Sequence, residues 1–169
     1  MSTTLNLGSV LCDATVWFEY TIGSTQQRCA EATEVIGALT TCGSQIWVPS
    51  TALADLTRVL PQALECARNE QVADPAAPLS DGERRALEAC ARASVAHVMD
   101  LARIVGVGQR ECERARELWP RLADFGRNLV IAAAESVGAA RIVTYDEEFR
   151  RAYPEICIDP QSFLVGTRS

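Results

Sequence analysis

The chain has 169 residues, of which 48% are hydrophobic and 22% are charged. These values are typical of a globular chain and exclude a disordered one. The formal net charge of −6 at pH 7 argues against non-specific adhesion to nucleic acid through a broad basic face. All 16 basic residues are Arg, which excludes any mechanism that requires a Lys.

Cysteine and histidine usage excludes the usual zinc sites. The seven cysteines are scattered singly, without a C-x-x-C spacing, and His97 is the only histidine. We interpret the cysteines as small buried hydrophobic residues in a reducing compartment. The N-terminus lacks a basic region followed by a long apolar run, and no segment reaches the ~20 apolar residues of a membrane-spanning helix. We therefore expect a cytoplasmic protein that makes no contact with a membrane.

The first part of the chain alternates between strand and helix patterns. Apolar runs predict strands over residues 6–13 and 45–48. Apolar residues at helical spacing predict helices over residues 26–41 and 50–68. In the second helix, Pro61 is expected to cause a kink or a break because it lacks a backbone N–H.

The middle of the chain is expected to be helical. Residues 69–80 read as a surface loop, and a capping-box pattern then opens a helix over residues 81–105. A second helix is predicted over residues 109–119. The tract 81–121 is dense in Arg and Glu, which indicates either a solvated face with i,i+4 pairs or a face that binds a partner.

The remaining elements continue the alternation. A helix is predicted over residues 124–137, a strand over 141–144, a short helix over 147–151, and a last strand over 156–158, followed by a tail from Asp159. Short strands that alternate with helices predict a parallel sheet covered on both faces. The fold class is therefore α/β.

Four acidic residues fall at the boundaries of these elements. Asp13 follows the first strand, Asp55 lies in the helix after the second, Asp124 begins a later helix, and Asp146 follows the next strand. Because ligands bind at the carboxyl ends of parallel strands, these carboxylates could converge. Like charges raise one another's pKa, so convergence favours a divalent metal such as Mg²⁺. Alternatively, Asp13 only caps a helix, Asp55 is a solvated acid, and Asp124 interacts with a helix dipole.

Five segments, in this order, carry a family resemblance. The first contains Asp13-Ala14-Thr15, and the fourth contains Thr144-Tyr145-Asp146. The segments are residues 10–16, 48–56, 129–139, 142–149 and 156–164. Together they resemble the PIN-domain family, metal-dependent ribonucleases that include the toxins of VapBC-type pairs. The resemblance implies a three-layer α/β/α sandwich with a short central parallel sheet. It also implies one domain over residues 1–169, in which residues 69–119 form an enlarged loop and helical section.

The same resemblance implies a function and a set of site residues. The expected activity is hydrolysis of RNA phosphodiesters by an endoribonuclease that depends on Mg²⁺ or Mn²⁺, with a metal-activated water as nucleophile. The expected biological role is the toxin of a type II toxin–antitoxin pair, with a cognate antitoxin and a homodimer as partners. Asp13, Asp146 and Asp124 are the expected metal ligands, and these three residues together with Asp55 form the expected catalytic set.

Two further residues are expected to support this set, and two positions of the site differ from the family pattern. Thr15 and Thr144 are expected to support the site by hydrogen bonding to ligands, water or phosphate, or alternatively are only hydroxyl groups at strand ends. Asn128 falls where the family has its third acid, and its amide oxygen carries no charge. Either Asp124, one helical turn upstream, takes over that role, or the site keeps only three strong ligands. Asp55 stands where Glu is usual, which shortens its reach by one methylene.

The sequence allows two alternatives for Arg127 and two for the function. Arg127 either contacts a phosphate or pairs with Asp124 or Glu135. The alternative to the enzyme is a catalytically weakened PIN fold that binds RNA or a protein, an alternative that Asn128 favours. Receiver domains, haloacid-dehalogenase-like phosphatases, P-loop and Rossmann proteins, and hydrolases with a G-x-S-x-G elbow lack their characteristic residues here.

Overall fold

The computed structural model describes residues 8–70 and 78–168. Its strands are β1 (Ser9–Cys12), β2 (Gln45–Pro49), β3 (Arg103–Val105), β4 (Arg141–Val143) and β5 (Cys157–Ile158). Its helices are α1 (Ala14–Thr21), α2 (Gln26–Thr41), α3 (Ser50–Asn69), α4 (Asp81–Leu101), α5 (Gln109–Glu117), α6 (Phe125–Ser136), α7 (Glu147–Ala152) and α8 (Pro160–Arg168). The elements expected from the sequence are thus present, with some changes at their ends.

In the described residues the strands form one parallel sheet in the order β3-β2-β1-β4-β5. The chain first builds outward from β1 to β2 and β3, and it then returns to place β4 on the other side of β1. Leu11 of β1 accordingly pairs with Trp47 of β2 and with Ile142 of β4. The point at which the strand order reverses lies between β1 and β4. In open parallel sheets this is where ligands bind, outside the carboxyl ends of the strands.

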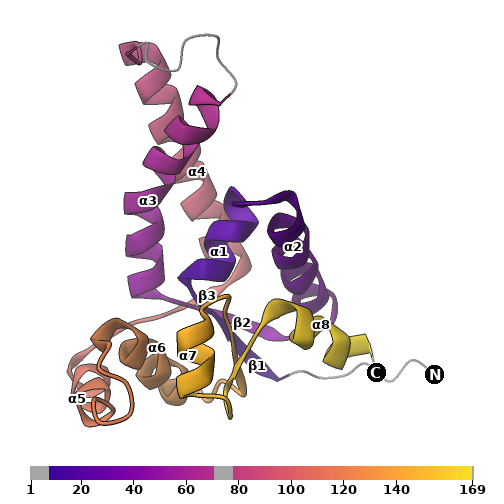
Figure 1. Cartoon of the computed structure of the whole chain (residues 1–169), viewed down its shortest axis with the longest axis vertical. Coiled ribbons are helices and arrows are strands. Elements are labelled where there is room, and N and C mark those ends of the chain that lie inside the picture. The colour runs from indigo at the N-terminus through magenta and orange to yellow at the C-terminus, as the bar shows by residue number, and fades with distance from the viewer. Residues whose placement is uncertain (1–7, 71–77, 169) are drawn as a thin grey trace.

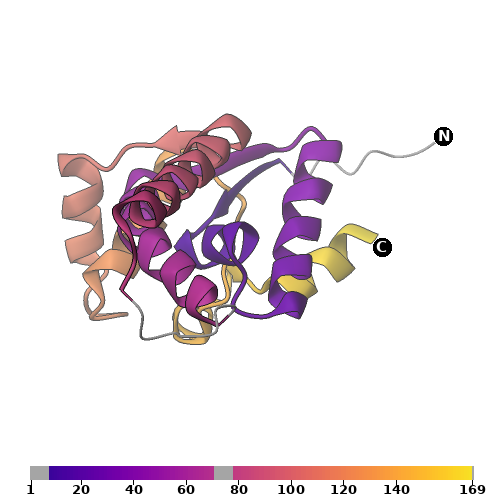
Figure 2. The same ribbon diagram turned by 90° about the horizontal axis from the view of Figure 1, so that it is seen from above.

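Side chains alternate between the two faces of the sheet and create two buried layers. Val10 and Cys12 of β1 belong to a core that also contains residues of α1, α2, α3, α4 and α8. Leu11, between them, points into a second core that includes residues of α6 and α7. Figure 2 shows the sheet with helices on both sides. The observed architecture is therefore the α/β fold with a covered parallel sheet that the sequence predicts.

Helices α3 and α4 extend together beyond the sheet as a helical hairpin (Figure 1). Leu56 and Leu60 of α3 are buried, whereas α4 buries only Ala91 and Val98. The predicted capping box opens α4, because the hydroxyl of Ser80 accepts the N–H of the third helical residue and that residue's carboxylate accepts the N–H of Ser80. Most of α4 is exposed, which agrees with both alternatives considered for this tract, a solvated face and a face that binds a partner.

Two expectations about secondary structure are wrong, and a third is wrong in part. The helix predicted to end at residue 105 ends at Leu101, because residues 103–105 form β3 and pair with β2. The expected tail after Asp159 is the helix α8, whose Phe163 and Leu164 are buried against the first core. Of the two effects expected of Pro61, the break is absent, because α3 continues through this residue, and the kink stays a prediction. The predicted loop at residues 69–80 falls partly on residues 71–77, outside the described residues.

The expectation that the cysteines are buried is only partly correct. Cys12 and Cys157 are buried, and burial raises the pKa of the Cys157 thiol to about 12. Cys66 and Cys90, on the α3–α4 hairpin, are exposed. Across the part of the chain that the structure describes, no helix combines the length and the apolar character needed to cross a membrane.

Candidate active site at the ends of β1 and β4

Asp13 lies at a strand end and also caps a helix. It directly follows β1, and it is the N-cap of α1. Its Oδ1 accepts hydrogen bonds from the N–H of Thr15 (2.9 Å), the hydroxyl of Thr15 (2.5 Å) and the N–H of Val16 (3.3 Å). Its Oδ2 accepts one from the hydroxyl of Thr144 (2.5 Å). The carboxylate is therefore held in one orientation by donors from two strand ends.

Burial dominates the electrostatics of Asp13. Its side chain is buried, and this burial raises the pKa of the carboxyl above its usual range. The hydrogen bonds from Thr144, Thr15 and Val16 oppose the shift because they stabilise the charged form, but they do not cancel it. A positive charge close to Asp13 would therefore relieve an electrostatic penalty that the protein alone leaves in place.

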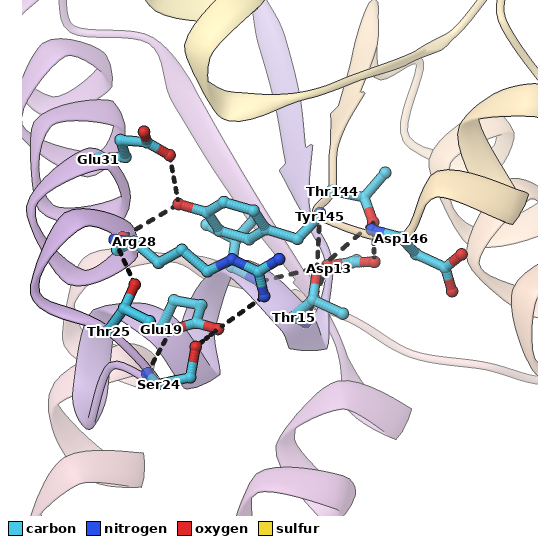
Figure 3. Close-up of polar contacts among 11 residues, drawn as sticks. Asp13, Thr15, Glu19, Ser24, Thr25, Arg28, Glu31, Thr144, Tyr145 and Asp146 are labelled. Carbon is cyan, nitrogen blue, oxygen red and sulfur yellow. Dashed lines mark hydrogen bonds and ion pairs between the residues drawn. The ribbon is translucent and has the colours of Figure 1, made fainter.

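Thr144 links the ends of the two central strands (Figure 3). Its buried hydroxyl donates to Asp13 and accepts the N–H of Asp146 at 3.0 Å. The hydroxyl of Thr15 in turn accepts the N–H of Tyr145 at 3.0 Å. Thr15 and Thr144 thus make the supporting hydrogen bonds expected from the sequence, and these bonds bring the segments after β1 and β4 together.

Asp146 is held by a helix and by an arginine. Its Oδ1 accepts the N–H of Phe149 and caps α7, while its Oδ2 lies 2.9 Å from Nε and 2.8 Å from Nη2 of Arg127. Nη1 of Arg127 donates to Glu148 at 2.6 Å and lies 3.7 Å from Asp124. Burial lowers the pKa of Arg127, but the hydrogen bonds to Glu148 and Asp146 outweigh it and raise the pKa overall. Arg127 is therefore a permanent cation beside Asp146.

The two alternatives considered for Arg127 are resolved in part. It pairs with Asp124, as one of them proposed, but its shorter contacts are with Glu148 and Asp146. Glu135, the other suggested partner, instead forms a two-pronged ion pair with Arg114. This pairing depends on how close α6 lies to the loop after β4 in the folded chain, which cannot be read from the sequence.

Asn128 points into the core. Its side chain is fully buried, its Nδ2 donates to the carbonyl of Leu122 at 2.7 Å, and its Oδ1 accepts the hydroxyl of Tyr153 at 2.7 Å. Both ends of the amide are thus engaged within the protein. This geometry gives Asn128 a structural role between α6 and the segment after α7.

Asp55 and Asp124 have different surroundings. Asp55 borders a cleft of about 440 Å³ beside the strand ends, and its carboxylate is 57% exposed and lies 3.2 Å from Arg58. Asp124 caps α6 by accepting the N–H of Arg127 at 2.9 Å. The residues that line the cleft are Ala14, Thr15, Phe18, Glu19, Arg28, Asp55, Leu56, Val59, Tyr145 and Asp146.

Three polar residues of the cleft were not expected as site residues. Glu19 is buried in α1, Arg28 belongs to α2, and Tyr145 lies between Thr144 and Asp146. Glu19 could have been noticed as a single acid in an apolar stretch, and Tyr145 as the central residue of a motif already assigned to the site. Arg28 stands in a polar helical sequence and carries no local indication of its position.

Only some of the expected acidic residues are suited to bind a hard cation. Asp13 and Asp146 offer carboxylate oxygens, and Mg²⁺ is usually bound through one or two carboxylates and several waters. Within residues 8–70 and 78–168, no group of three or more His, Cys, Asp or Glu side chains is arranged to hold a metal ion. The carboxylates of Asp13 and Asp146 are therefore of the chemical type that a hard cation binds, whereas the four acids expected from the sequence are not gathered into one cluster in the described residues.

Comparisons with known proteins agree with this fold. A chain from the VapBC2 complex of Rickettsia felis, solved with a DNA fragment from its promoter, is similar over 89% of this chain and 98% of its own, at 12% identity and a TM-score of 0.57. The protein PAE2754 from Pyrobaculum aerophilum is similar over 99% of this chain and 94% of its own, at 16% identity and a TM-score of 0.59. No curated protein matches the sequence significantly. The sequence model of the PIN domain matches residues 10–154, and the chain therefore belongs to the PIN domain family.

Proposed function

We propose that this protein is an endoribonuclease that uses Mg²⁺ or Mn²⁺ to hydrolyse RNA phosphodiesters. The observation that carries the proposal is the bridge formed by Thr144, which binds Asp13 and the backbone of Asp146 at the point where the strand order reverses. Membership of the PIN domain family supports the same reading. The cleft beside these residues offers space for substrate.

In this proposal Asp13 and Asp146 hold the cation, and Asp55 borders the adjoining cleft. A bound divalent cation would supply an activated water and neutralise charge on the phosphodiester. Thr15 and Thr144 keep Asp13 in a single orientation, so that little reorganisation is needed during the reaction. A metal role for Asp124 stays a prediction, and its observed contacts are those of a helix cap.

The test combines metal titration with RNA cleavage. Calorimetry with Mn²⁺ and cleavage of a fluorescently labelled single-stranded RNA are measured for the wild type, for Asp13→Asn and for Asp100→Asn, an exposed residue of α4 that serves as the matched control. We expect metal-dependent cleavage that falls more than ~100-fold in Asp13→Asn, since loss of partners outside the ligands alone costs 10- to 100-fold. Absence of metal-dependent cleavage, or an equal loss in Asp100→Asn, would contradict the proposal.

A second candidate is a PIN fold that binds RNA without cutting it. The contact of Arg127 with Asp146 favours this alternative, because a fixed cation already balances a carboxylate that the enzyme would use for metal. The buried, neutral Asn128 points in the same direction. This candidate would be selected if the protein binds RNA but shows no heat of Mn²⁺ binding in calorimetry and does not cleave the RNA.

We also propose that the enzyme acts as a toxin restrained by a cognate antitoxin. The likeness in fold to a chain of the VapBC2 complex supports this role, and a homodimer remains a further expectation. Expression of the wild-type chain in a bacterial host should arrest growth, and Asp13→Asn should relieve the arrest. Growth arrest of equal strength with Asp13→Asn would count against a toxin that acts through this site.

A further inference from the structure

The cleft beside the strand ends has two chemically different sides. Ala14, Phe18, Leu56 and Val59 supply an apolar wall, and most of the exposed lining is apolar. A volume of about 440 Å³ lies within the range of sites that enclose a small molecule. An apolar wall next to a site for phosphodiesters is suited to a flat, weakly polar group that is covalently attached to a phosphate.

Arg28 is the single cation among the described residues that line this cleft, which also contains Glu19, Asp55 and Asp146. Its side chain is 51% exposed, and its guanidinium carbon lies 5.2 Å from the centroid of the Tyr145 ring. A guanidinium has five N–H donors in a planar fork that matches a phosphate. Arg28 therefore stands where an anion entering an acidic cleft would find a partner.

Glu19 positions Arg28 without saturating it. The carboxylate of Glu19 is buried and accepts the N–H and the hydroxyl of Ser24 at 2.6 and 2.7 Å. Its contact with Nη1 of Arg28 is longer, at 3.4 Å. The short bonds satisfy much of the Glu19 charge, so that Arg28 is steered toward the cleft while its fork keeps donors for a ligand (Figure 3).

Tyr145 provides a rigid aromatic surface. Its hydroxyl donates to the backbone carbonyl of Arg28 at 3.0 Å and lies 3.5 Å from the carboxylate of Glu31, while its backbone N–H donates to Thr15. Figure 3 shows the ring held between α2 and the loop after β4. Aromatic side chains and Arg planes are the surfaces on which proteins stack the bases of single-stranded RNA.

We propose that this cleft binds one unstacked nucleotide of a single-stranded RNA, with its phosphate on Arg28 and its base against Phe18 and the Tyr145 ring. The proposal rests on the proposed function, since it supplies the substrate subsite next to the strand-end carboxylates. A single cation and a net charge of −6 do not suit the long phosphate track of a duplex. Recognition of one exposed base needs only the local cation and the aromatic wall.

The test measures base stacking directly. A short single-stranded RNA that carries 2-aminopurine at one position is titrated with protein in EDTA, which prevents metal-dependent cleavage, and the probe is moved along the RNA. We expect saturable quenching at one or two probe positions. Arg28→Ala should weaken binding at least ~10-fold, as expected for loss of a charged fork on a phosphate. Phe18→Leu, which keeps an apolar side chain, should retain most of the affinity but reduce the quenching.

Arg92→Ala is the matched control. Arg92 lies on α4 with 69% of its side chain exposed, and its ion pair with Glu88 is long, at 3.8 Å. It removes the same charge and should leave affinity and quenching unchanged. Equal behaviour of Arg28→Ala and Arg92→Ala, or no quenching at any probe position, would overturn the proposal. Cleavage with Mn²⁺ in the same preparations separates the two claims. Cleavage without quenching would contradict the nucleotide subsite but not the nuclease proposal. Arg28-dependent quenching without cleavage would support the subsite and contradict the nuclease proposal.

Discussion

Replacement of Asn128 by Asp distinguishes a structural amide from a weakened metal ligand. The family pattern places an acid at this position, so a role at the metal would predict that Asn128→Asp strengthens metal binding. The observed contacts predict a different outcome. The Nδ2 of Asn128 donates to the carbonyl of Leu122, and an ionised carboxylate would instead direct an acceptor at that buried carbonyl.

The magnitude follows from the cost of protonation. A neutral Asp at position 128 could still donate to Leu122 and accept from Tyr153, as the amide does. A carboxyl group has an ordinary pKa of about 4, and each pH unit above it costs about 1.4 kcal/mol, so the neutral form at pH 7 costs about 4 kcal/mol. If ionising the buried carboxyl costs less free energy than keeping it neutral, the loss of stability is smaller than this value. We therefore expect the variant to lose up to about 4 kcal/mol of unfolding free energy at pH 7.

The pH dependence has a definite sign. Burial favours the neutral carboxyl, so its pKa in the folded state lies above that in the unfolded state. The penalty is then absent below about pH 4 and grows by about 1.4 kcal/mol per unit as the pH rises toward the folded pKa. Urea unfolding followed by tryptophan fluorescence, at pH values from 5 to 8, measures the difference between Asn128→Asp and the wild type.

Asn69→Asp is the control for the added charge, since Asn69 ends α3 on the hairpin and contacts Arg68. We expect a change within about 0.5 kcal/mol for this variant. A stable Asn128→Asp protein that binds Mn²⁺ more tightly than the wild type would refute the structural role of Asn128. A loss of stability that does not diminish toward low pH would refute the argument from protonation.

Two further substitutions test the connections around Asp13 and Asp146. Thr144→Val removes the bridging hydroxyl at nearly constant volume, and it should lower the unfolding free energy by about 2–4 kcal/mol in urea titrations and weaken Mn²⁺ binding. Unchanged stability would show that the bridge contributes little. Arg127→Gln should raise the affinity for Mn²⁺ severalfold in calorimetry, because it releases Asp146 from a fixed cation. Arg114→Gln, which loses a comparable surface ion pair, should bind Mn²⁺ as the wild type does, and equal affinities in both variants would contradict the reasoning.

The positions of the strand-end residues followed from sequence because they depend on local patterns. Asp13 comes after a short apolar run, and Thr144 and Asp146 come after another. Such runs indicate buried parallel strands, and parallel strands end on one edge of a sheet. The helix over residues 26–41 was likewise predicted with the observed bounds, since apolar spacing and its Thr25 cap are properties of the segment itself.

Elements that depend on a distant partner were predicted less well. The three residues of β3 follow α4 closely and have no strand pattern long enough to identify them, and they form a strand because they pair with β2. Helix α8 is short, and its buried Phe163 and Leu164 reach the core formed by α2. In both cases the stabilising contacts come from residues far away in the chain.

The sequence by itself therefore determined the fold class, the two central strand ends and the hydroxyl groups that support Asp13. Only the tertiary structure decided that Asn128 turns inward to Tyr153, that Arg127 pairs with Asp146, and that Arg28 reaches the cleft. The physical reason is that backbone conformation depends largely on neighbouring residues, whereas the partner of a side chain depends on strand order and helix packing. A polar residue in a helical stretch has several possible partners, and the packed fold selects among them.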